Sequence, residues 1–263
     1  MKDDIIFQAG VPVVLVPGWG FQPSILKPLA ETIQRSYQVS VTVCTLPGYA
    51  DAPDWKVNTG SVYRDWDALS DYLMAQVPAH PAIWMGWSLG GMIALYLATR
   101  HADRVKKVIT IASNVKFIRD KSWAGGIERH TLQQLRQDLQ QNYQATLERF
   151  IQLQCLGLPQ AKTMVRDLKA YVSTQPQPQM SALQQQLDWL MHMDLRVCID
   201  DLCVPILQLF GERDTLVPIQ AADLIEQHYG HRIAVKRLEG AGHAPFLSDP
   251  QAFLTLLDSH VLS

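Results

Sequence analysis

Paired cysteines, long apolar runs and an excess of charge of either sign are all missing from this sequence of 263 residues. The four cysteines show no C-x-x-C spacing, so neither a zinc knuckle nor a redox pair is expected; they are Cys44, Cys155, Cys198 and Cys203. So few cysteines in a chain of this length indicate free thiols and a cytoplasmic location. Nowhere do 18 apolar residues follow one another, and residues 1–10 hold no apolar segment, so we expect neither a membrane span nor a signal peptide.

The balance of charge limits the classes of partner. Lysine and arginine total 23 against 25 aspartates and glutamates, a net charge of -2, so the chain has no general basic field for nucleic acid. With 48% hydrophobic residues it has enough apolar material for a full core, which excludes a disordered chain. The length fits one large α/β domain, or a domain that carries an insertion.

Short apolar runs alternate with helical patterns at both ends of the chain. The predicted strands are 11–16, 39–46, 82–86, 105–112, 204–210 and 233–238, and the predicted helices are 25–35, 62–76, 90–101, 219–229 and 250–260. Strands that alternate with helices imply right-handed crossovers and a mostly parallel sheet with helices on both faces. We therefore predict an α/β fold.

The middle of the chain, residues 114–193, contains no good strand. Apolar residues at steps of three and four predict one long helix that includes 132–150, followed by helices at 161–172 and 181–193. An all-helical insertion in an α/β frame is expected to form a lid over the carboxyl edge of the sheet, where ligands bind in such folds. The predicted organisation is a core of residues 1–113 and 194–263 with a lid of residues 114–193.

The segment Gly86-Trp87-Ser88-Leu89-Gly90-Gly91 follows a predicted strand and opens a predicted helix. The G-x-S-x-G pattern alone is weak, because a glycine-rich helix start would look the same. The strand before it and the helix after it are what a nucleophile on a tight strand-to-helix turn requires. Ser88 is therefore the candidate nucleophile.

A serine hydroxyl needs a base, and the base needs an acid to orient it. Of the eight histidines, His243 lies in a Gly- and Pro-containing loop directly after the last predicted strand, whereas the others fall in helices, surface loops or the terminus. Asp214 follows the strand before that and precedes a turn, with Glu212 as its competitor. The order Ser88, Asp214, His243 is the chain order of α/β-hydrolases, so these three are the predicted catalytic triad.

Two backbone amides are candidates for the oxyanion hole. One belongs to Leu89, which follows the nucleophile at a helix N-terminus, and the other to Trp19 in the Pro17-Gly18-Trp19-Gly20 loop after the first strand. The indole of Trp19 is also a candidate wall of the acyl channel, although ordinary core packing is the alternative for this ring.

These residues resemble the α/β-hydrolase superfamily from Val11 to the C-terminus, and more specifically the biotin-pathway carboxylesterases. The closer resemblance rests on residues 86–91, 108–113 and 242–246, and above all on Leu147-Glu148-Arg149-Phe150-Ile151-Gln152-Leu153-Gln154. It implies hydrolysis of the methyl ester of pimeloyl-acyl-carrier protein, with no metal or organic cofactor. The expected protein is a cytoplasmic monomer that binds neither nucleic acid nor membrane.

The same resemblance implies two groups of binding residues. The substrate would contact Trp19, Ser88, Leu89, Phe150, Ile151, Gln152, Leu153, Gln154 and His243. The acidic carrier protein would dock on a basic lid face formed by Arg149, Lys162, Arg166 and Lys169. A solvated lid face with no partner is the alternative for these four cations.

Two other functions remain open at this point. A general carboxylesterase or C–C bond hydrolase of the same fold would cleave small free esters and ignore a carrier protein. A binding protein that kept only the hydrolase shell would not react with a fluorophosphonate, but the complete, ordered triad favours an enzyme.

Overall fold

The computed structural model describes residues 7, 10–53, 60–247 and 250–261. Most of residues 1–10, on which the expectation about a signal peptide rests, lie outside the described part. Six strands form one sheet: β1 Val13–Val16, β2 Val41–Val43, β3 Ala82–Trp87, β4 Val105–Ile111, β5 Ile206–Gly211 and β6 Ile233–Leu238. Their order is β2-β1-β3-β4-β5-β6, and all the pairs are parallel, as the alternating pattern predicted.

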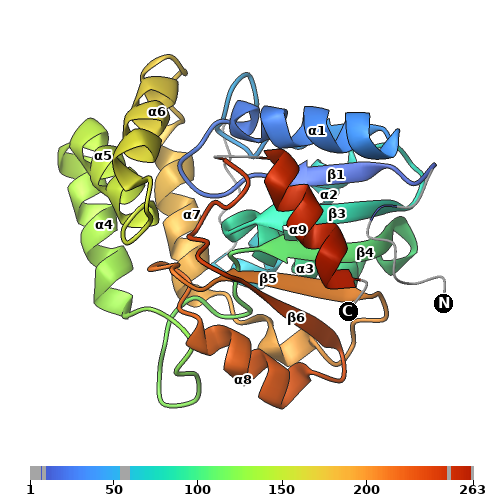
Figure 1. The fold of residues 1–263 in the computed structure, drawn as a ribbon. Coiled ribbons are helices and arrows are strands. Elements are labelled where there is room, and N and C mark those ends of the chain that lie inside the picture. Colours follow the sequence, from blue (N-terminus) through green and yellow to red (C-terminus); the bar gives the residue numbers. More distant parts are fainter. Residues whose placement is uncertain (1–6, 8–9, 54–59, 248–249, 262–263) are drawn as a thin grey trace.

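Five helices belong to the alternating part of the chain: α1 Lys27–Tyr37, α2 Val62–Met74, α3 Leu89–Arg100, α8 Gln220–Tyr229 and α9 Pro250–Val261. Short 3₁₀ helices cover Pro23–Leu26, Ala102–Arg104 and Leu195–Cys198. Helix α9 crosses the front of the sheet beside α1, with which it is in contact, while α2 and α3 lie behind the sheet (Figure 1). The sheet is thus covered on both faces.

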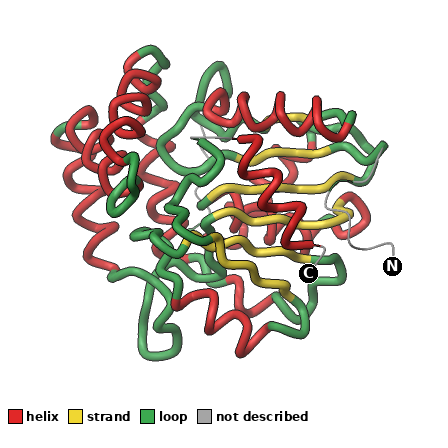
Figure 2. Tube along the Cα trace, viewed as in Figure 1, coloured by secondary structure: helices red, strands yellow, loops and turns green. Residues whose placement is uncertain are grey.

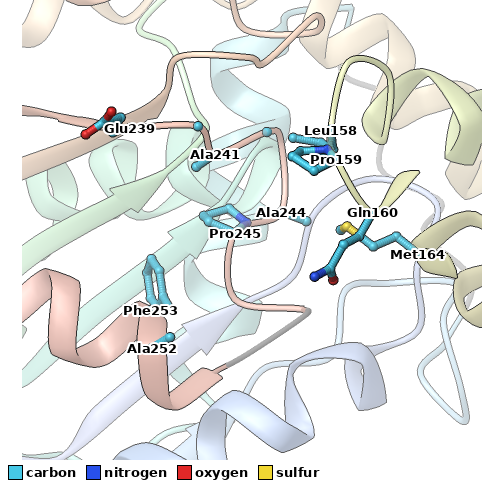
Figure 3. Close-up of a pocket in the computed structure, with 12 residues that line it drawn as sticks. Leu158, Pro159, Gln160, Met164, Glu239, Ala241, Ala244, Pro245, Ala252 and Phe253 are labelled. Carbon is cyan, nitrogen blue, oxygen red and sulfur yellow. The ribbon is translucent and has the colours of Figure 1, made fainter. Parts of the chain in front are cut away.

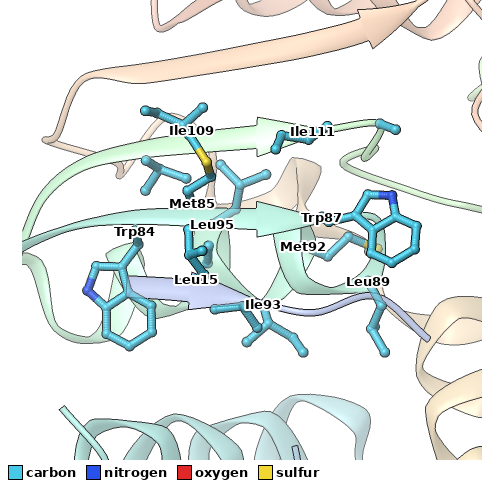
Figure 4. Close-up of a cluster of buried hydrophobic side chains, with 14 of the residues drawn as sticks. Leu15, Trp84, Met85, Trp87, Leu89, Met92, Ile93, Leu95, Ile109 and Ile111 are labelled. Carbon is cyan, nitrogen blue, oxygen red and sulfur yellow. The ribbon is translucent and has the colours of Figure 1, made fainter. Parts of the chain in front are cut away.

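The strands are hydrophobic on both faces because both are covered. Every residue of β1, β3 and β5 is buried. Figure 4 shows the centre of this core, where side chains of β3 meet those of β1, β4 and α3, among them Leu15, Met85, Ile93 and Ile109. Near-continuous apolar runs of this kind are typical of parallel strands, which explains why their positions were readable from the sequence.

The helical insertion between β4 and β5 contains α4 Arg129–Gln141, α5 Tyr143–Gln154, α6 Ala161–Ser173 and α7 Met180–His192. These four helices lie together at one end of the sheet (Figures 1 and 2). Residues 114–128, ahead of α4, form a loop with isolated β-bridges. In the described part of the chain, no helix is both long and apolar enough to cross a membrane.

The prediction of one long helix through 132–150 is wrong. The chain leaves helical geometry at Asn142, which has φ −155° and ψ 94° and caps α5 by accepting a hydrogen bond from the backbone N–H of Ala145 at 3.0 Å. Asparagine is a strong N-cap because its side-chain oxygen satisfies an amide that has no partner within the helix. The apolar period continues through the break, so periodicity alone did not reveal it.

Candidate active site

The carboxyl ends of the strands lie level at the edge that faces the helical insertion. The pairs Val16–Gly86, Trp87–Ile111 and Gly211–Leu238 are neighbours in the sheet. The chain runs outward from β1 to β2 and then returns to the other side of β1 with β3, so the direction of winding reverses between β1 and β3. Open parallel sheets bind ligands at such a reversal, because the loops after the two strands separate there. The loop that holds Trp19 and the turn that holds Ser88 flank this point.

Ser88 stands between β3 and α3 with φ 54° and ψ −119°. A positive φ is unusual for a residue with a side chain, costs on the order of 1–3 kcal/mol and persists only where the surroundings enforce it. Here the Ser88 N–H donates to the carbonyl of Ile111 at 2.9 Å, and the Ser88 carbonyl accepts from the hydroxyl of Ser113 at 2.7 Å and from the N–H of Gly91 at 3.0 Å. Both the N–H and the carbonyl of the serine are therefore held by hydrogen bonds.

The glycines around the serine have a steric cause. A Cβ on Gly86 would lie 2.1 Å from the carbonyl oxygen of Gly90, and a Cβ on Gly90 would lie 2.2 Å from that of Val16. Neither distance is possible for real atoms. Strand β3, the start of α3 and the end of β1 approach too closely for any side chain, which is why this turn needs glycine on both sides of Ser88.

His243 and Asp214 form a buried pair. His243 Nδ1 lies 2.8 Å from Asp214 Oδ2, and the side chains are 1% and 0% exposed. The other carboxylate oxygen, Oδ1, accepts from the backbone N–H groups of Leu216 at 2.8 Å and Val217 at 3.0 Å. With Nδ1–H donating to the carboxylate, Nε2 is left as the nitrogen that can accept a proton. The exposed competitor Glu212 instead accepts from the N–H of Gly240 at 3.2 Å.

Trp87, the residue directly before the serine, links the nucleophile to the histidine loop. Its indole N–H donates to the carbonyl of His243 at 2.7 Å, and its ring lies 5.7 Å from the His243 ring and 5.3 Å from that of Phe246. Trp87 occupies a variable position of the G-x-S-x-G motif, so this link was not predicted from the sequence. The sequence contained one indication of such a link, because the N–H of a buried tryptophan side chain needs a hydrogen-bond acceptor.

Among the described residues, no hydrogen bond joins the side chains of Ser88 and His243. Such contacts are often long or poorly aligned before a substrate is bound. The three predicted triad residues all lie at the carboxyl edge, after β3, β5 and β6.

The two candidate oxyanion donors come from either side of the winding reversal. Leu89 is the first residue of α3, and the first N–H groups of a helix have no acceptor within it. Across from it, the loop after β1 packs against the nucleophile, since a Cβ on Gly18 would lie 3.3 Å from Ser88 Cβ. Trp19 is 3% exposed, and its ring meets that of Phe150 edge to face at 4.8 Å.

The five candidate substrate residues of α5 divide between two faces. Phe150, Ile151 and Gln154 are buried, whereas Gln152 and Leu153 are exposed. The helical period explains the division, because residues three and four apart share a face. Gln154 is 3% exposed, and neither atom of its side-chain amide has a hydrogen-bond partner among the described residues. Its backbone carbonyl lies near Gly242, beside the histidine, so the end of α5 that carries Gln154 adjoins the histidine loop.

The predicted basic lid face is partly neutralised by neighbouring acids. Arg149 pairs with Asp138 of α4 at 2.7 Å, and Lys169 of α6 pairs with Glu148 of α5. The hydrogen bond from Lys169 holds the pKa of Glu148 below its usual value.

The remaining two cations of this face are on α6. Within the part of the chain that the structure describes, Arg166 forms an ion pair with its neighbour Asp167 alone, at 2.9 Å, and Lys162 is exposed. These two are therefore more available to an outside partner than Arg149 and Lys169.

A cavity of about 400 Å³ adjoins the histidine loop (Figure 3). One wall is the α5–α6 connection, where Leu158 and Pro159 lie close to Ala244 and Pro245 of the histidine loop, and Phe253 of α9 lies at the other end (Figure 3). The lining is mostly apolar. As for metals, no group of three or more potential ligands is found in the described residues.

The chain matches known proteins along most of its length. Residues 11–250 match the model of the alpha/beta hydrolase fold family. The chain is 36% identical to a pimeloyl-[acyl-carrier protein] methyl ester esterase of Aliivibrio salmonicida over 94% of this chain and 91% of that protein. It is also 36% identical to the protein of the same name from Pectobacterium carotovorum, over 92% and 90%.

Solved structures agree in fold. An esterase from Exiguobacterium antarcticum superimposes with a TM-score of 0.78 at 20% identity, over 98% of this chain and 94% of the other. An enol-lactonase from Burkholderia xenovorans gives 0.74 at 18% identity, over 97% and 93%.

Proposed function

Since the chain belongs to the α/β-hydrolase fold family and, within it, to the pimeloyl-[acyl-carrier protein] methyl ester esterases, we propose that it hydrolyses the methyl ester of pimeloyl-acyl-carrier protein for biotin synthesis. The chemistry is that of a carboxylic ester hydrolase with a serine nucleophile. The observation that carries the proposal is the buried Asp214–His243 pair, at 2.8 Å, beside the strained turn of Ser88.

The reaction proceeds in two steps. His243 Nε2 takes the Ser88 proton as Oγ attacks the ester carbonyl, and the resulting tetrahedral oxyanion is stabilised by the amides of Leu89 and Trp19. The C–O bond to the methoxy group then breaks, and His243 returns the proton so that methanol leaves. In the second step His243 takes a proton from water, the hydroxide attacks the acyl-enzyme, and Ser88 regains its proton as the free carboxylate is released.

Asp214 has a supporting role in both steps. Its carboxylate keeps the proton of His243 on Nδ1 and stabilises the imidazolium that forms. The two backbone N–H groups on Oδ1 hold the carboxylate in one orientation, so the imidazole is aligned before substrate arrives.

The acyl chain is assigned to the apolar wall made by Trp19, Phe150 and Ile151, which are buried beside the site. The unsatisfied amide of Gln154 supplies a hydrogen-bonding group for a carbonyl of the substrate, because a buried polar group without a partner is costly until a ligand provides one. Gln152 and Leu153 are exposed, so we assign them to the outer edge of the substrate site and not to the apolar wall.

For the carrier protein, Lys162 and Arg166 are assigned as the primary contacts, because their positive charges are the more available ones. Arg149 and Lys169 would bind the carrier protein only if their ion pairs with Asp138 and Glu148 were replaced by ion pairs with acidic residues of the carrier. The protein is further proposed to be a cytoplasmic monomer, consistent with four free cysteines, and size-exclusion chromatography tests the monomer directly.

The proposed nucleophile is tested with Ser88→Ala and a fluorophosphonate probe. Wild type is expected to be labelled at Ser88 and to hydrolyse both carrier-bound and free methyl esters, whereas Ser88→Ala loses nearly all turnover and all labelling. Retained esterase activity in Ser88→Ala would refute the assignment. A wild-type protein that the probe does not label would instead indicate a binding protein.

A further inference from the structure

The loop after β1 is tied to a loop after β2 by one buried hydroxyl. The backbone N–H of Gly20, next to Trp19, donates to the Tyr49 hydroxyl at 3.0 Å. The same hydroxyl donates to Gln186 Oε1 of α7 at 2.9 Å. Tyr49 is 0% exposed and Gln186 is 1% exposed, so no water competes for these bonds. A continuous chain of hydrogen bonds thus runs from α7 to the loop that supplies the candidate oxyanion donor.

The direction of each bond follows from the atoms that make it. A backbone N–H can only donate, so the Tyr49 oxygen is the acceptor from Gly20. The single hydroxyl proton is then directed to the carbonyl oxygen of the Gln186 amide. Burial raises the pKa of Tyr49 far above its ordinary value, so the hydroxyl keeps its proton and serves as a hydrogen-bond bridge and not as an acid or base.

Helix α7 also holds the side chain of Trp19. The indole Nε1–H donates to the backbone carbonyl of Leu183 at 2.9 Å. Leu183 and Gln186 are three residues apart on α7 and therefore share one face. Trp19 is consequently fixed twice by the same helix face, at its ring through Leu183 and at its following peptide through Tyr49 and Gln186.

The contact between α7 and the Tyr49 loop leaves no space for adjustment. The N–H of Gln179, just before α7, donates to the carbonyl of Gly48 at 2.8 Å. Gly48 has φ +79°, and a Cβ there would lie 2.3 Å from Ala182 Cβ. The residue before Tyr49 therefore lies directly against α7, which sets where the tyrosine ring enters the site.

We propose that Tyr49 and Gln186 are positioning residues: they hold the Trp19–Gly20 peptide and thereby orient the Trp19 N–H, which belongs to the preceding peptide, toward the oxyanion hole. The inference rests on the proposed function, because it requires Trp19 to be an oxyanion donor. It assigns to α7 a part in the chemistry that is separate from covering the substrate: the insertion sets the geometry of the oxyanion loop through buried hydrogen bonds.

The test removes the bridge at either end. Tyr49→Phe loses both hydrogen bonds while keeping the ring, and Gln186→Met removes the acceptor at similar volume. Each is expected to lower kcat by roughly tenfold, less than the ~10²–10³ that follows loss of an oxyanion donor itself, with KM within about twofold. Because the defect lies in the oxyanion hole, carrier-bound and free esters should lose the same factor, and labelling by the fluorophosphonate should slow to match.

Tyr96→Phe is the matched control, because it removes another largely buried tyrosine hydroxyl, one that contacts Asp67 and the carbonyl of Tyr63. Its kcat should equal that of wild type. If both Tyr49→Phe and Gln186→Met keep kcat within twofold of wild type while Ser88→Ala is inactive, the hydrogen bonds of Tyr49 are only structural. The inference is then overturned, whereas the proposed function stands. If Ser88→Ala is active, the proposed function and the inference fail together. Should Tyr49→Phe not fold, Gln186→Met decides the question by the same criterion.

Discussion

Hydrogen bonds hold the backbone of Ser88 and the carboxylate of Asp214 in place, and that carboxylate in turn pairs with His243. The serine backbone bonds to the carbonyl of Ile111 and the hydroxyl of Ser113, and the aspartate accepts from two amides of its own turn. The groups that are proposed to react are therefore supported before a substrate binds. Preorganisation of this kind lowers the barrier because little rearrangement is needed during the reaction.

The orienting role of the Asp214 carboxylate predicts a large loss of activity when it is replaced by an amide. Asp214→Asn keeps the shape but can present an amide N–H to His243 Nδ1, which favours the tautomer with the proton on Nε2. That tautomer cannot accept the serine proton, so kcat should fall about 10³- to 10⁴-fold, measured with any ester that wild type cleaves.

Glu212→Gln is the control for Asp214→Asn, since Glu212 is exposed and contacts Gly240 and not the histidine. Its kcat is expected within about twofold of wild type. A loss of less than tenfold in Asp214→Asn, or an equal loss in Glu212→Gln, would contradict the assignment of the acid.

Among the elements, strands were easier to predict than breaks between helices. The runs that became β1, β3 and β5 are buried on both faces, so the apolar signal is nearly continuous, and observed ends differ from predicted ones by up to a few residues. The order of the candidate triad was readable because each residue follows a strand. The roles of Tyr49 and Trp87 could not be predicted, since they come from contacts with segments far along the chain.

The cap at Asn142, where α4 gives way to α5, predicts a measurable contribution of this side chain to stability. Asn142→Ala removes the oxygen that caps α5, so the free energy of unfolding, measured in urea, should fall by about 1 kcal/mol. Asn142→Asp retains a capping oxygen and should remain near wild type. Unchanged stability in Asn142→Ala would show that α4 and α5 are held only by their packing.

In the whole molecule, the sheet and the helical insertion meet at one edge. The parallel sheet places the proposed nucleophile, acid and base in loops at one edge, and the insertion between β4 and β5 brings α5, α6 and α7 to the same edge. Net charge is close to balanced, so recognition of an acidic partner depends on local charge and not on the overall field. Within the basic lid face, the internal ion pairs concentrate that local charge on Lys162 and Arg166 of α6.

The most direct measurement is kcat/KM for the methyl ester of pimeloyl-acyl-carrier protein and for free dimethyl pimelate, at low salt. Wild type would be compared with the double variant Lys162→Glu/Arg166→Glu. A matched variant, Arg35→Glu/Lys106→Glu, makes the same change of charge at exposed positions in the last turn of α1 and near the start of β4. These positions lie at the end of the sheet opposite the active site.

We predict that wild type prefers the carrier-bound ester and that the α6 variant loses about tenfold or more on that substrate alone, because two attractions become repulsions. Added salt should shrink the difference, since exposed charges are screened. The matched variant should behave as wild type. Equal activity of all three proteins on both substrates would contradict the account and identify the chain as a general carboxylesterase.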